Sequence, residues 1–582
     1  MEQKTCKQCQ KEFVVEDEDL AFFKKISPLF VGKKYLVSPP TLCPECRLRR
    51  RLSFRNVRKL YKRKSEISGK DLISCYAPNF GFKVISTEEF ESDEFDAKKY
   101  GRDFDFNRPF FEQFKDLMRN VPRPHATISS GTLKNAEFVN GASFTKNAYM
   151  SFNLVGDEDV YYCDSLFHSK DCVDCLYSLK IENCYECIDS RNLYGCFYCL
   201  DCDNSHELYF CHNMNSCRNC FGCSSLNNKQ YYIYNKKVTK DEFEKFMHDF
   251  KFTPDAINEA IQKARELDLK QPHKFARLIN CEDCTGNYLT NAKNCKTCFR
   301  CTDVENIKYG LTLDGSVKDS MDVSLIYNNF ELGLENLISG HDSYNILFSS
   351  QCHTNCRDIY YSDCCYRGNK NLFGCIGLTN SQYCILNKQY SKEEYEVLVP
   401  KIINHMQRAG EWGEFFPMSL SPYGYNETLG GDMFPLKKEE AEKAGANWQD
   451  DSFDIKYDGP FYEPKPIADY DPSKNSDAKA QIDLALKGII KCSKSGRPFR
   501  IIAQELAFYI KHGLPIPTIH PELRYKKRYT KTMPAILYRR QCTYEEQGHD
   551  HEGRCKNEFE TTYAPDRPEK VYCEECYQKS VI

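Results

Sequence analysis

The most regular pattern along the chain is a period of twelve residues between about 135 and 238. Small and apolar residues recur at fixed places in each unit, while Asn, Asp, Lys and Ser fill most other positions. A short fixed period with polar bends predicts a β-solenoid, in which each coil stacks on the last. The period leaves open whether one coil holds one unit or two. The clearest column consists of Cys163, Cys175, Cys187, Cys199, Cys211 and Cys223.

A second column, three residues earlier in each unit, separates two interpretations of these cysteines, which we call the cysteine ladder. Repeated C-x-x-C pairs are typical of zinc and iron–sulfur sites. Where cysteine is missing, however, the second column holds residues that bind no metal, such as Val160 and Leu208. We therefore interpret the ladder as small buried core residues. A metal or redox buffer that uses these thiols is the alternative.

The end of this region, residues 219–246, has a near copy at 371–398. In both copies the last strand precedes a helix whose first residues have capping-box spacing. Residues 280–390 hold further, less regularly spaced cysteines, so the duplication predicts a second β-solenoid there. The capping pairs are Thr239 with Glu242 and Ser391 with Glu394.

Cysteines of a different kind stand at the two ends of the chain. Two C-x-x-C pairs that are separated by a long loop place four thiolates around one tetrahedral zinc ion, at about 2.3 Å per bond. With no coordination position left for water, such an ion is structural. We therefore expect two structural zinc ions, with His549 or His551 as a substitute ligand in the second site. The ligands are Cys6, Cys9, Cys43 and Cys46 in the first site and Cys542, Cys555, Cys573 and Cys576 in the second.

The two ends are themselves duplicated, because residues 43–65 align with 520–542 and residues 75–86 align with 562–573. Each end is thus a tandem of two small modules, A and then B. At the N-terminus module A has all four cysteines, whereas Ser65, Ser86 and Glu89 replace three ligands of module B. At the C-terminus module B has all four. The degenerate module A there keeps Cys492, with Ser495, His520 and Leu523 at the other positions.

These observations predict a mixed, mainly β protein, with two β-solenoid regions capped by helices and flanked by treble-clef or zinc-ribbon modules. The expected segments are a zinc module with a basic helix (1–64), a degenerate zinc ribbon (65–107), a connecting helix (108–134), the first solenoid (135–238), a helical cap (239–279), the second solenoid (280–390), a helix with a Pro/Gly/aromatic connector (391–475), a degenerate copy of the N-terminal module (476–540) and a zinc ribbon (541–582).

A resemblance supports the zinc assignment at the N-terminus. The sequence CKQCQKEFVV…LCPECRLRRR is similar to a small bacterial zinc-binding domain with the pattern C-x-x-C-G…C-P-x-C-R, and it departs from that pattern at Gln10. The resemblance implies zinc binding over about 50 residues. The whole arrangement resembles a cysteine-rich zinc-ribbon family from candidate-phyla bacteria, some members of which carry a CoA-transferase label. No motif in this chain supports that label.

Charge is concentrated next to the modules, although the net charge is only −3. Residues 47–64 hold ten Lys or Arg and no acid, and residues 524–540 hold seven and no acid. Such fields attract phosphates, and interleaved aromatic rings suit single strands. The alternative is a solvated charged face, or one that pairs with the acidic segment 87–96. The candidate nucleic-acid contacts are Arg47, Arg49, Arg50, Arg51, Arg55, Arg58, Lys59, Lys62, Arg63, Arg524, Lys526, Lys527 and Arg528, with Phe54, Tyr61, Tyr525 and Tyr529 as stacking rings.

The functional hypothesis is a non-enzymatic, zinc-stabilised scaffold that binds nucleic acid, with RNA or a ribosome favoured over DNA. The alternative is a protein-assembly platform on the solenoid faces, where an aromatic column and oligomerisation would contribute. No G-x-S-x-G, GxxxxGK[ST] or HExxH motif marks an enzyme. We expect a cytoplasmic protein that uses no membrane, because the N-terminus lacks a signal-peptide pattern and no apolar run approaches roughly 20 residues. The aromatic column is Tyr185, Phe197, Tyr209 and Phe221.

Overall fold

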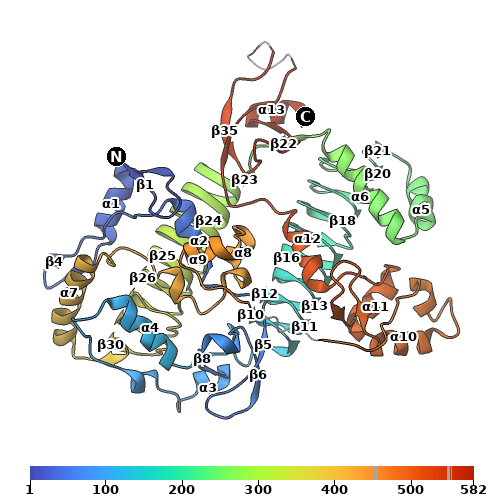
Figure 1. The fold of residues 1–582 in the computed structure, drawn as a ribbon. Coiled ribbons are helices and arrows are strands. Elements are labelled where there is room, and N and C mark those ends of the chain that lie inside the picture. Colours follow the sequence, from blue (N-terminus) through green and yellow to red (C-terminus); the bar gives the residue numbers. More distant parts are fainter. Residues whose placement is uncertain (451–455, 547–550, 552, 582) are drawn as a thin grey trace.

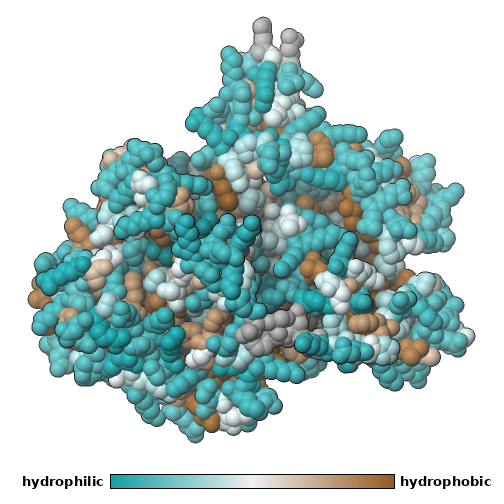
Figure 2. Space-filling model, in the orientation of Figure 1, coloured by the Kyte–Doolittle hydropathy of each residue, from teal (hydrophilic) through white to brown (hydrophobic). Residues whose placement is uncertain are grey.

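The computed structural model describes residues 1–450, 456–546, 551 and 553–581. It is mainly β, and two parallel β-solenoids form its centre (Figure 1). The face shown in Figure 2 is largely hydrophilic, with hydrophobic residues in small separate groups. The predicted fold class is therefore confirmed.

In the first solenoid each coil has twelve residues. Lys146 pairs in parallel with Lys134 on one side and with Glu158 on the other, each twelve residues away. This register decides between the one-unit and two-unit coils. The strands are β9 (Lys134–Glu137), β10 (Asn140–Ser143), β11 (Lys146–Tyr149), β12 (Phe152–Val155), β13 (Glu158–Tyr161), β14 (Asp164–Phe167), β15 (Lys170–Val173), β16 (Leu176–Tyr185), β17 (Arg191–Tyr194), β18 (Asp203–Tyr209), β19 (Arg218–Phe221) and β20 (Gln230–Ile233).

Backbone bends explain why the repeat is rich in Asn and Asp. Left-handed conformations recur at every third residue, for example at Asn147, Met150 and Asn153, whose φ angles are 53°, 45° and 51°. Asn and Asp adopt this conformation more readily than other L-residues. The residue after each bend is buried inside the coil, as at Ala148 and Ser151. A coil thus has four short sides of three residues each.

The cysteine ladder lies inside this coil. Cys163 and Cys187 have no exposed surface, and both belong to a cluster of buried cysteines, leucines and other small apolar side chains. The Cys163 thiol lies 3.4 Å from the carbonyl oxygen of Tyr161 and 3.5 Å from that of Cys172, as a donor to both. The same pattern recurs along the ladder. Cysteine therefore fills a narrow core and supplies a weak donor to carbonyl groups at the bends.

The second solenoid has coils of variable length, which accounts for its irregular sequence. Val317 pairs with Phe330, thirteen residues later, whereas Lys370 pairs with Gln382, twelve residues later. Leucine, isoleucine, valine and phenylalanine supply most of its core. Its strands are β23 (Leu278–Ile279), β24 (Glu282–Tyr327), β25 (Phe330–Gly340), β26 (Ser343–Leu347), β27 (Ser350–His353), β28 (Arg357–Tyr360), β29 (Lys370–Phe373) and β30 (Gln382–Ile385).

Helices follow the last coil of each solenoid, and the predicted capping boxes are present. The Glu242 amide donates to the Thr239 hydroxyl (3.3 Å), and the Glu394 amide donates to the Ser391 hydroxyl (3.1 Å). In both pairs the glutamate accepts from the amide of its partner in return. The elements are β21 (Lys236–Lys237), α5 (Lys240–Asp249) and α6 (Pro254–Asp268) after the first solenoid, and β31 (Lys388–Gln389) and α7 (Lys392–Ala409) after the second.

The two ends of the chain share a common order of elements, which is a hairpin and two helices, then a hairpin, a strand and a helix; each end also has a few elements of its own. The N-terminal end has β1 (Glu2–Thr5), β2 (Glu12–Val15), α1 (Asp17–Ile26), β3 (Leu29–Phe30), β4 (Lys33–Lys34), α2 (Pro44–Leu52), β5 (Tyr61–Lys64), β6 (Asp71–Ser74), β7 (Val84–Ile85), α3 (Thr87–Glu91), α4 (Phe110–Asn120) and β8 (Arg123–Pro124). The C-terminal end has α10 (Ala478–Lys487), β32 (Ile490–Lys491), β33 (Pro498–Phe499), α11 (Ala503–His512), α12 (Pro521–Tyr529), β34 (Tyr538–Gln541), β35 (Glu558–Thr561), β36 (Lys570–Tyr572) and α13 (Glu574–Val581). Between α7 and α10 the connector holds α8 (Leu429–Met433) and α9 (Lys438–Lys443).

The N-terminal module A packs on the second solenoid, and the C-terminal module A packs on the first solenoid. We call this the crossed arrangement. Phe23 and Leu52 of the N-terminal module share a hydrophobic cluster with Val323 of the second solenoid. Leu506 of the C-terminal copy shares a cluster with Val173 of the first. In Figure 1, α2 accordingly lies beside β24 and α12 lies beside β16.

The crossed arrangement covers the predicted aromatic column. Tyr185 and Phe197 belong to the cluster that includes Leu506 and Tyr509 of the C-terminal module A. Further along, the Phe221 ring packs against Phe246 of α5, with ring centres 4.8 Å apart. This face of the solenoid therefore binds parts of its own chain.

Candidate metal centres and the arginines beside them

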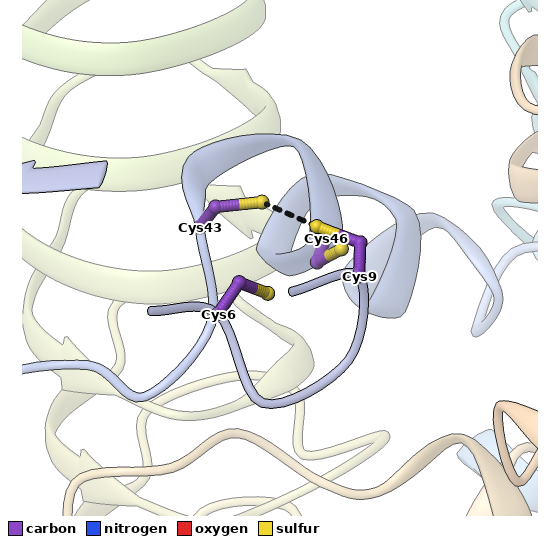
Figure 3. A group of neighbouring side chains, drawn as sticks. All are labelled: Cys6, Cys9, Cys43 and Cys46. Carbon is purple, nitrogen blue, oxygen red and sulfur yellow. Dashed lines mark hydrogen bonds between the residues drawn. The ribbon is translucent and has the colours of Figure 1, made fainter. Parts of the chain in front are cut away.

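Four cysteines of the N-terminal module A converge as the sequence predicts (Figure 3). One ligand atom from each lies within 4.8 Å of the others, and the sulfurs of Cys9 and Cys43 are 3.6 Å apart. The first pair sits on the turn after β1, and Cys43 precedes the first residue of α2. Gln10, which departs from the glycine of the similar pattern, has a φ of 62°. It thus adopts the left-handed conformation that glycine favours.

The electrostatics of this group fit a metal ion. Hydrogen bonding to Cys46 lowers the pKa of the Cys43 thiol to about 5, and the same contact raises the pKa of Cys46. The cluster thus favours one thiolate but opposes several in the absence of a cation. Because zinc binds thiolates and displaces their protons, four sulfurs at this spacing suit it. These residues could hold one ion, which would join the β1–β2 turn to the start of α2.

A second group of four forms in the C-terminal module B from Cys542, Cys555, Cys573 and Cys576, all of them buried. The Cys573 amide donates to the Cys542 sulfur at 3.3 Å, and α13 begins at the next residue. In the described part of the chain, only these two sets bring three or more His, Cys, Asp or Glu ligand atoms together. His551 lies outside the set, with its Nδ1 2.8 Å from the Gly553 carbonyl oxygen, and His549 lies outside the described residues.

The degenerate N-terminal module B replaces metal ligands with hydrogen bonds. The Ser65 hydroxyl donates to the Glu89 carboxylate at 2.5 Å, and the Ser86 amide donates to the same carboxylate at 2.8 Å. Burial disfavours the charge, but hydrogen bonds from Ser65, Ser68 and Ser86 prevail and lower the pKa of Glu89 to about 2. The Glu89 carboxylate, which is hydrogen-bonded by three serines, therefore links the segments of this module that a zinc ion would link in the intact copy.

The degenerate C-terminal module A also keeps the turn at Cys492, although it lacks the other three cysteines. The amides of Ser495 and His520 lie 3.5 and 3.3 Å from the Cys492 sulfur. Burial opposes ionisation of the Cys492 thiol, but hydrogen bonds from the Ser495 side chain and from the backbone amides of His520, Ser495 and Lys494 prevail and lower its pKa to about 7. The His520 ring accepts from the Glu522 amide and caps α12. Local polar contacts thus hold both metal-free copies.

Arginines of α2 carry the docking of the N-terminal module on the second solenoid. Arg47 pairs with Asp322 at 2.8 Å, and Arg51 pairs with Asp322 at 2.9 Å and with Glu335 at 3.0 Å. Arg50 contacts Glu335 as well. All five side chains are less than a tenth exposed. Buried charges of this kind are tolerated only when they are paired.

The C-terminal copy repeats this contact on the first solenoid. Arg524 and Arg528, which align with Arg47 and Arg51, pair with Asp174 at 2.7 and 2.6 Å. The aspartates correspond as well, because each lies four coils before the matching Gly222 or Gly374 in the aligned solenoid ends. Matching tyrosines complete the likeness: Arg524 lies over Tyr162 and Arg47 lies over Tyr309, at 4.8 and 5.1 Å from the ring centres.

The acidic partners of these arginines were not predicted from the sequence. The acidic residues lie in the solenoids, 275 residues away from Arg47 and 350 away from Arg524. The acidic segment 87–96, which we considered as a partner, instead contributes Glu91 to a pair with Arg367. One signal was available: the spacing of four between the arginines is the same in both copies, and an aspartate recurs at the same coil position in both solenoids.

The remaining candidate nucleic-acid contacts divide by exposure. Arg55 is buried, and Arg49, Arg58, Lys59 and Arg63 are half-buried. Arg55 donates to Thr127 and Asn153, and Arg63 donates to backbone carbonyls. The exposed members are Lys62, Lys526 and Lys527. Of the proposed stacking rings, Phe54, Tyr61 and Tyr525 are buried and Tyr529 is half-buried.

Comparison with known proteins adds no identity: no protein-family model and no curated protein sequence matches the chain. None of the helices in the described part of the chain combines the length and the apolar character that crossing a bilayer requires.

Proposed function

We propose that this protein is a non-enzymatic, zinc-stabilised scaffold that binds single-stranded nucleic acid, RNA in preference to DNA. One observation carries the proposal: the basic segments from the two ends of the chain meet. The Arg58 guanidinium lies 3.6 Å from the centre of the Tyr525 ring, and Lys59 pairs with Glu522. We call four lysines of the two segments that meet here the basic seam, in which Lys59 is half-buried and the others are exposed: Lys59, Lys62, Lys526 and Lys527.

The role of zinc follows from the placement of its ligands. Cys46 lies in α2 and directly precedes Arg47, so a metal that fixes this cysteine also orients the arginines that dock on the second solenoid. At the other end, Cys573 directly follows β36, which pairs with β22 (Pro272–Lys274) ahead of the second solenoid. Zinc would thus hold each end at its docking place and keep the seam together.

The test is the salt dependence of binding to a single-stranded RNA, measured by fluorescence anisotropy. Four lysine contacts predict that log K falls with log salt with a slope of roughly −3. Replacement of all four seam lysines by glutamine should flatten that slope and weaken binding at least roughly tenfold at low salt. The matched control is Lys240, Lys245, Lys251 and Lys270→Gln, which removes the same charge from exposed positions on and beside the helical cap. Equal binding by the two variants would refute the seam.

A protein partner is the second candidate, and a different observation favours it. The first solenoid begins with β9, which pairs only with β11 among the described strands, so its outer edge is open. Phe144 and Phe138 beside it are 69% and 37% exposed. An open strand edge with apolar neighbours suits strand addition by another chain. A defined partner that survives nuclease treatment, and that is lost in Phe144→Glu, would favour this function.

A metal or redox buffer would use the cysteine ladder. Most ladder thiols are at most 2% exposed and donate to carbonyl oxygens. Binding of more than two zinc ions per chain would favour the buffer over the scaffold.

A further inference from the structure

A cavity of about 380 Å³ lies where β22, the later coils of the first solenoid and the C-terminal zinc module meet. Its walls include His212 and Asp203 of the solenoid, His273 of β22, and Tyr577 of α13. The size suits a ligand as large as a nucleoside. No residue at this place belongs to the zinc groups or to the basic seam.

The duplicated half of the molecule shows that this space could have been filled. Val84 pairs with Arg123 in the N-terminal half, and the aligned Val571 pairs with His273, so Arg123 and His273 occupy matching positions. Arg123 is 1% exposed and reaches Asp363 at 2.8 Å. It fills its junction. Histidine is shorter, and His273 lines the cavity at the C-terminal junction. A hollow of this size with several polar side chains in its walls is suited to a small ligand.

The charges around the cavity cancel among themselves. His212 lies between two carboxylates, with Asp268 at 2.5 Å and Asp201 at 3.3 Å. Burial lowers the pKa of His212, but the charges of Asp268 and Asp201 outweigh it and raise the pKa to about 10. Arg277 pairs with Asp203. Near neutrality, this histidine is therefore a fixed imidazolium with compensated charge, and the walls favour a ligand without net charge.

The remaining wall offers a ring and a set of polar groups. Tyr577 directly follows the cysteine ligand Cys576 and is half-buried. Among the described residues, its ring stacks on no other aromatic ring. The Lys274 ammonium group pairs with Glu574 at 2.7 Å, and an ammonium group has three N–H donors. The Asn213 side-chain nitrogen donates to Ser225, and the amide oxygen of Asn213 can accept hydrogen bonds from a ligand. A planar, neutral ligand with donors and acceptors on its edge matches this wall.

We propose that this cavity binds one nucleoside of a single strand, with the base stacked on Tyr577. The inference rests on the proposed function, because an unstacked base from a strand on the basic seam is the natural source of such a ligand. It also supplies the stacking ring that Phe54, Tyr61 and Tyr525, being buried, cannot supply. Since α13 begins beside the zinc ligands, loss of the metal should loosen Tyr577 and weaken this site.

The test is calorimetric titration of the full-length, zinc-loaded protein with uridine and with adenosine, with ribose as the control probe. We expect a Kd on the order of 0.1–1 mM for at least one nucleoside, and little change between about 50 and 300 mM NaCl. Tyr577→Ala should weaken binding at least roughly fivefold, whereas Tyr577→Phe should retain it. Tyr194→Ala, at a tyrosine that is 47% exposed on the first solenoid, is the matched control.

The outcomes separate this inference from the proposed function. If neither nucleoside binds, or if Tyr577→Ala binds as well as the native protein, the cavity assignment is wrong, and salt-dependent RNA binding can still stand. If a nucleoside binds in a Tyr577-dependent way but RNA does not bind, the cavity is a nucleoside site and the strand-binding function is wrong.

Discussion

Replacement of Asp174 by asparagine should detach the C-terminal module A from the first solenoid. Asp174 is fully buried and forms ion pairs with Arg524 at 2.7 Å and with Arg528 at 2.6 Å. Asparagine keeps the shape but removes the charge, so two buried guanidinium groups lose their main partner. Removal of one partner from a buried ion pair costs about 3–5 kcal/mol.

Two other contacts set the expected value within that range. Arg524 keeps a carboxylate, Glu505, at 3.4 Å, and Arg528 keeps the carbonyl oxygen of Tyr162 at 3.2 Å. These partners compensate in part, so we expect a loss near the lower end, about 3 kcal/mol. Stabilities of whole domains are about 5–15 kcal/mol, so this loss is large enough to open the module locally.

The assay is hydrogen exchange of residues 503–529, together with urea unfolding. Amides of α11 and α12 should exchange on the order of a hundredfold faster in Asp174→Asn, while those of α2 should not change. Asp171→Asn, three residues earlier and half-buried, is the matched control and should shift stability by less than about 0.5 kcal/mol. A loss below about 1 kcal/mol in Asp174→Asn, or faster exchange spread evenly over the chain, would refute docking by this ion pair.

Three further results should follow. Asp322→Asn should destabilise α2 less than Asp174→Asn destabilises α12, because Glu335 still faces Arg51 at 3.0 Å; urea unfolding of both variants checks the order. The carboxyl of Glu89 should titrate near pH 2 by NMR, so its stabilising contribution is complete above the ordinary pKa of about 4.5 and is lost as the pH falls toward 2; a titration near 4.5 would contradict the serine cluster. Cys187→Ala should lower stability by about 1 kcal/mol without changing RNA binding, as expected of a core residue; loss of bound metal in this variant would contradict that role.

The solenoids could be predicted because the residues that determine each coil lie close together in the sequence. A period of twelve residues fixes the pairing of each coil with the next, and the Asn and Asp residues at many of the third positions fit the left-handed bends. The thirteen-residue coils of the second solenoid were harder to see, since an extra residue per coil breaks the columns that define a repeat. The metal groups were equally accessible, because C-x-x-C spacing fixes the local turn.

The crossed arrangement could not be read in the same way. Whether a run of arginines faces water or a buried carboxylate depends on residues hundreds of positions away, such as Asp322 for Arg47. A basic stretch without acids therefore predicts a charged surface, although Arg47, Arg50 and Arg51 are buried in ion pairs here. The duplication was the usable clue, since Arg47 and Arg51 recur as Arg524 and Arg528 with the same spacing.

The central claim, a scaffold whose two ends are held by zinc, is tested most directly by the metal content of the intact protein. Native mass spectrometry should show two zinc ions per chain in the native protein. It should show one ion in the Cys9→Ser variant, one ion in the Cys576→Ser variant, and none in the double variant. Removal of the first ion should speed hydrogen exchange in α2, and removal of the second should speed it in α13. A chain that carries no zinc, or that keeps both ions in the double variant, would contradict the account.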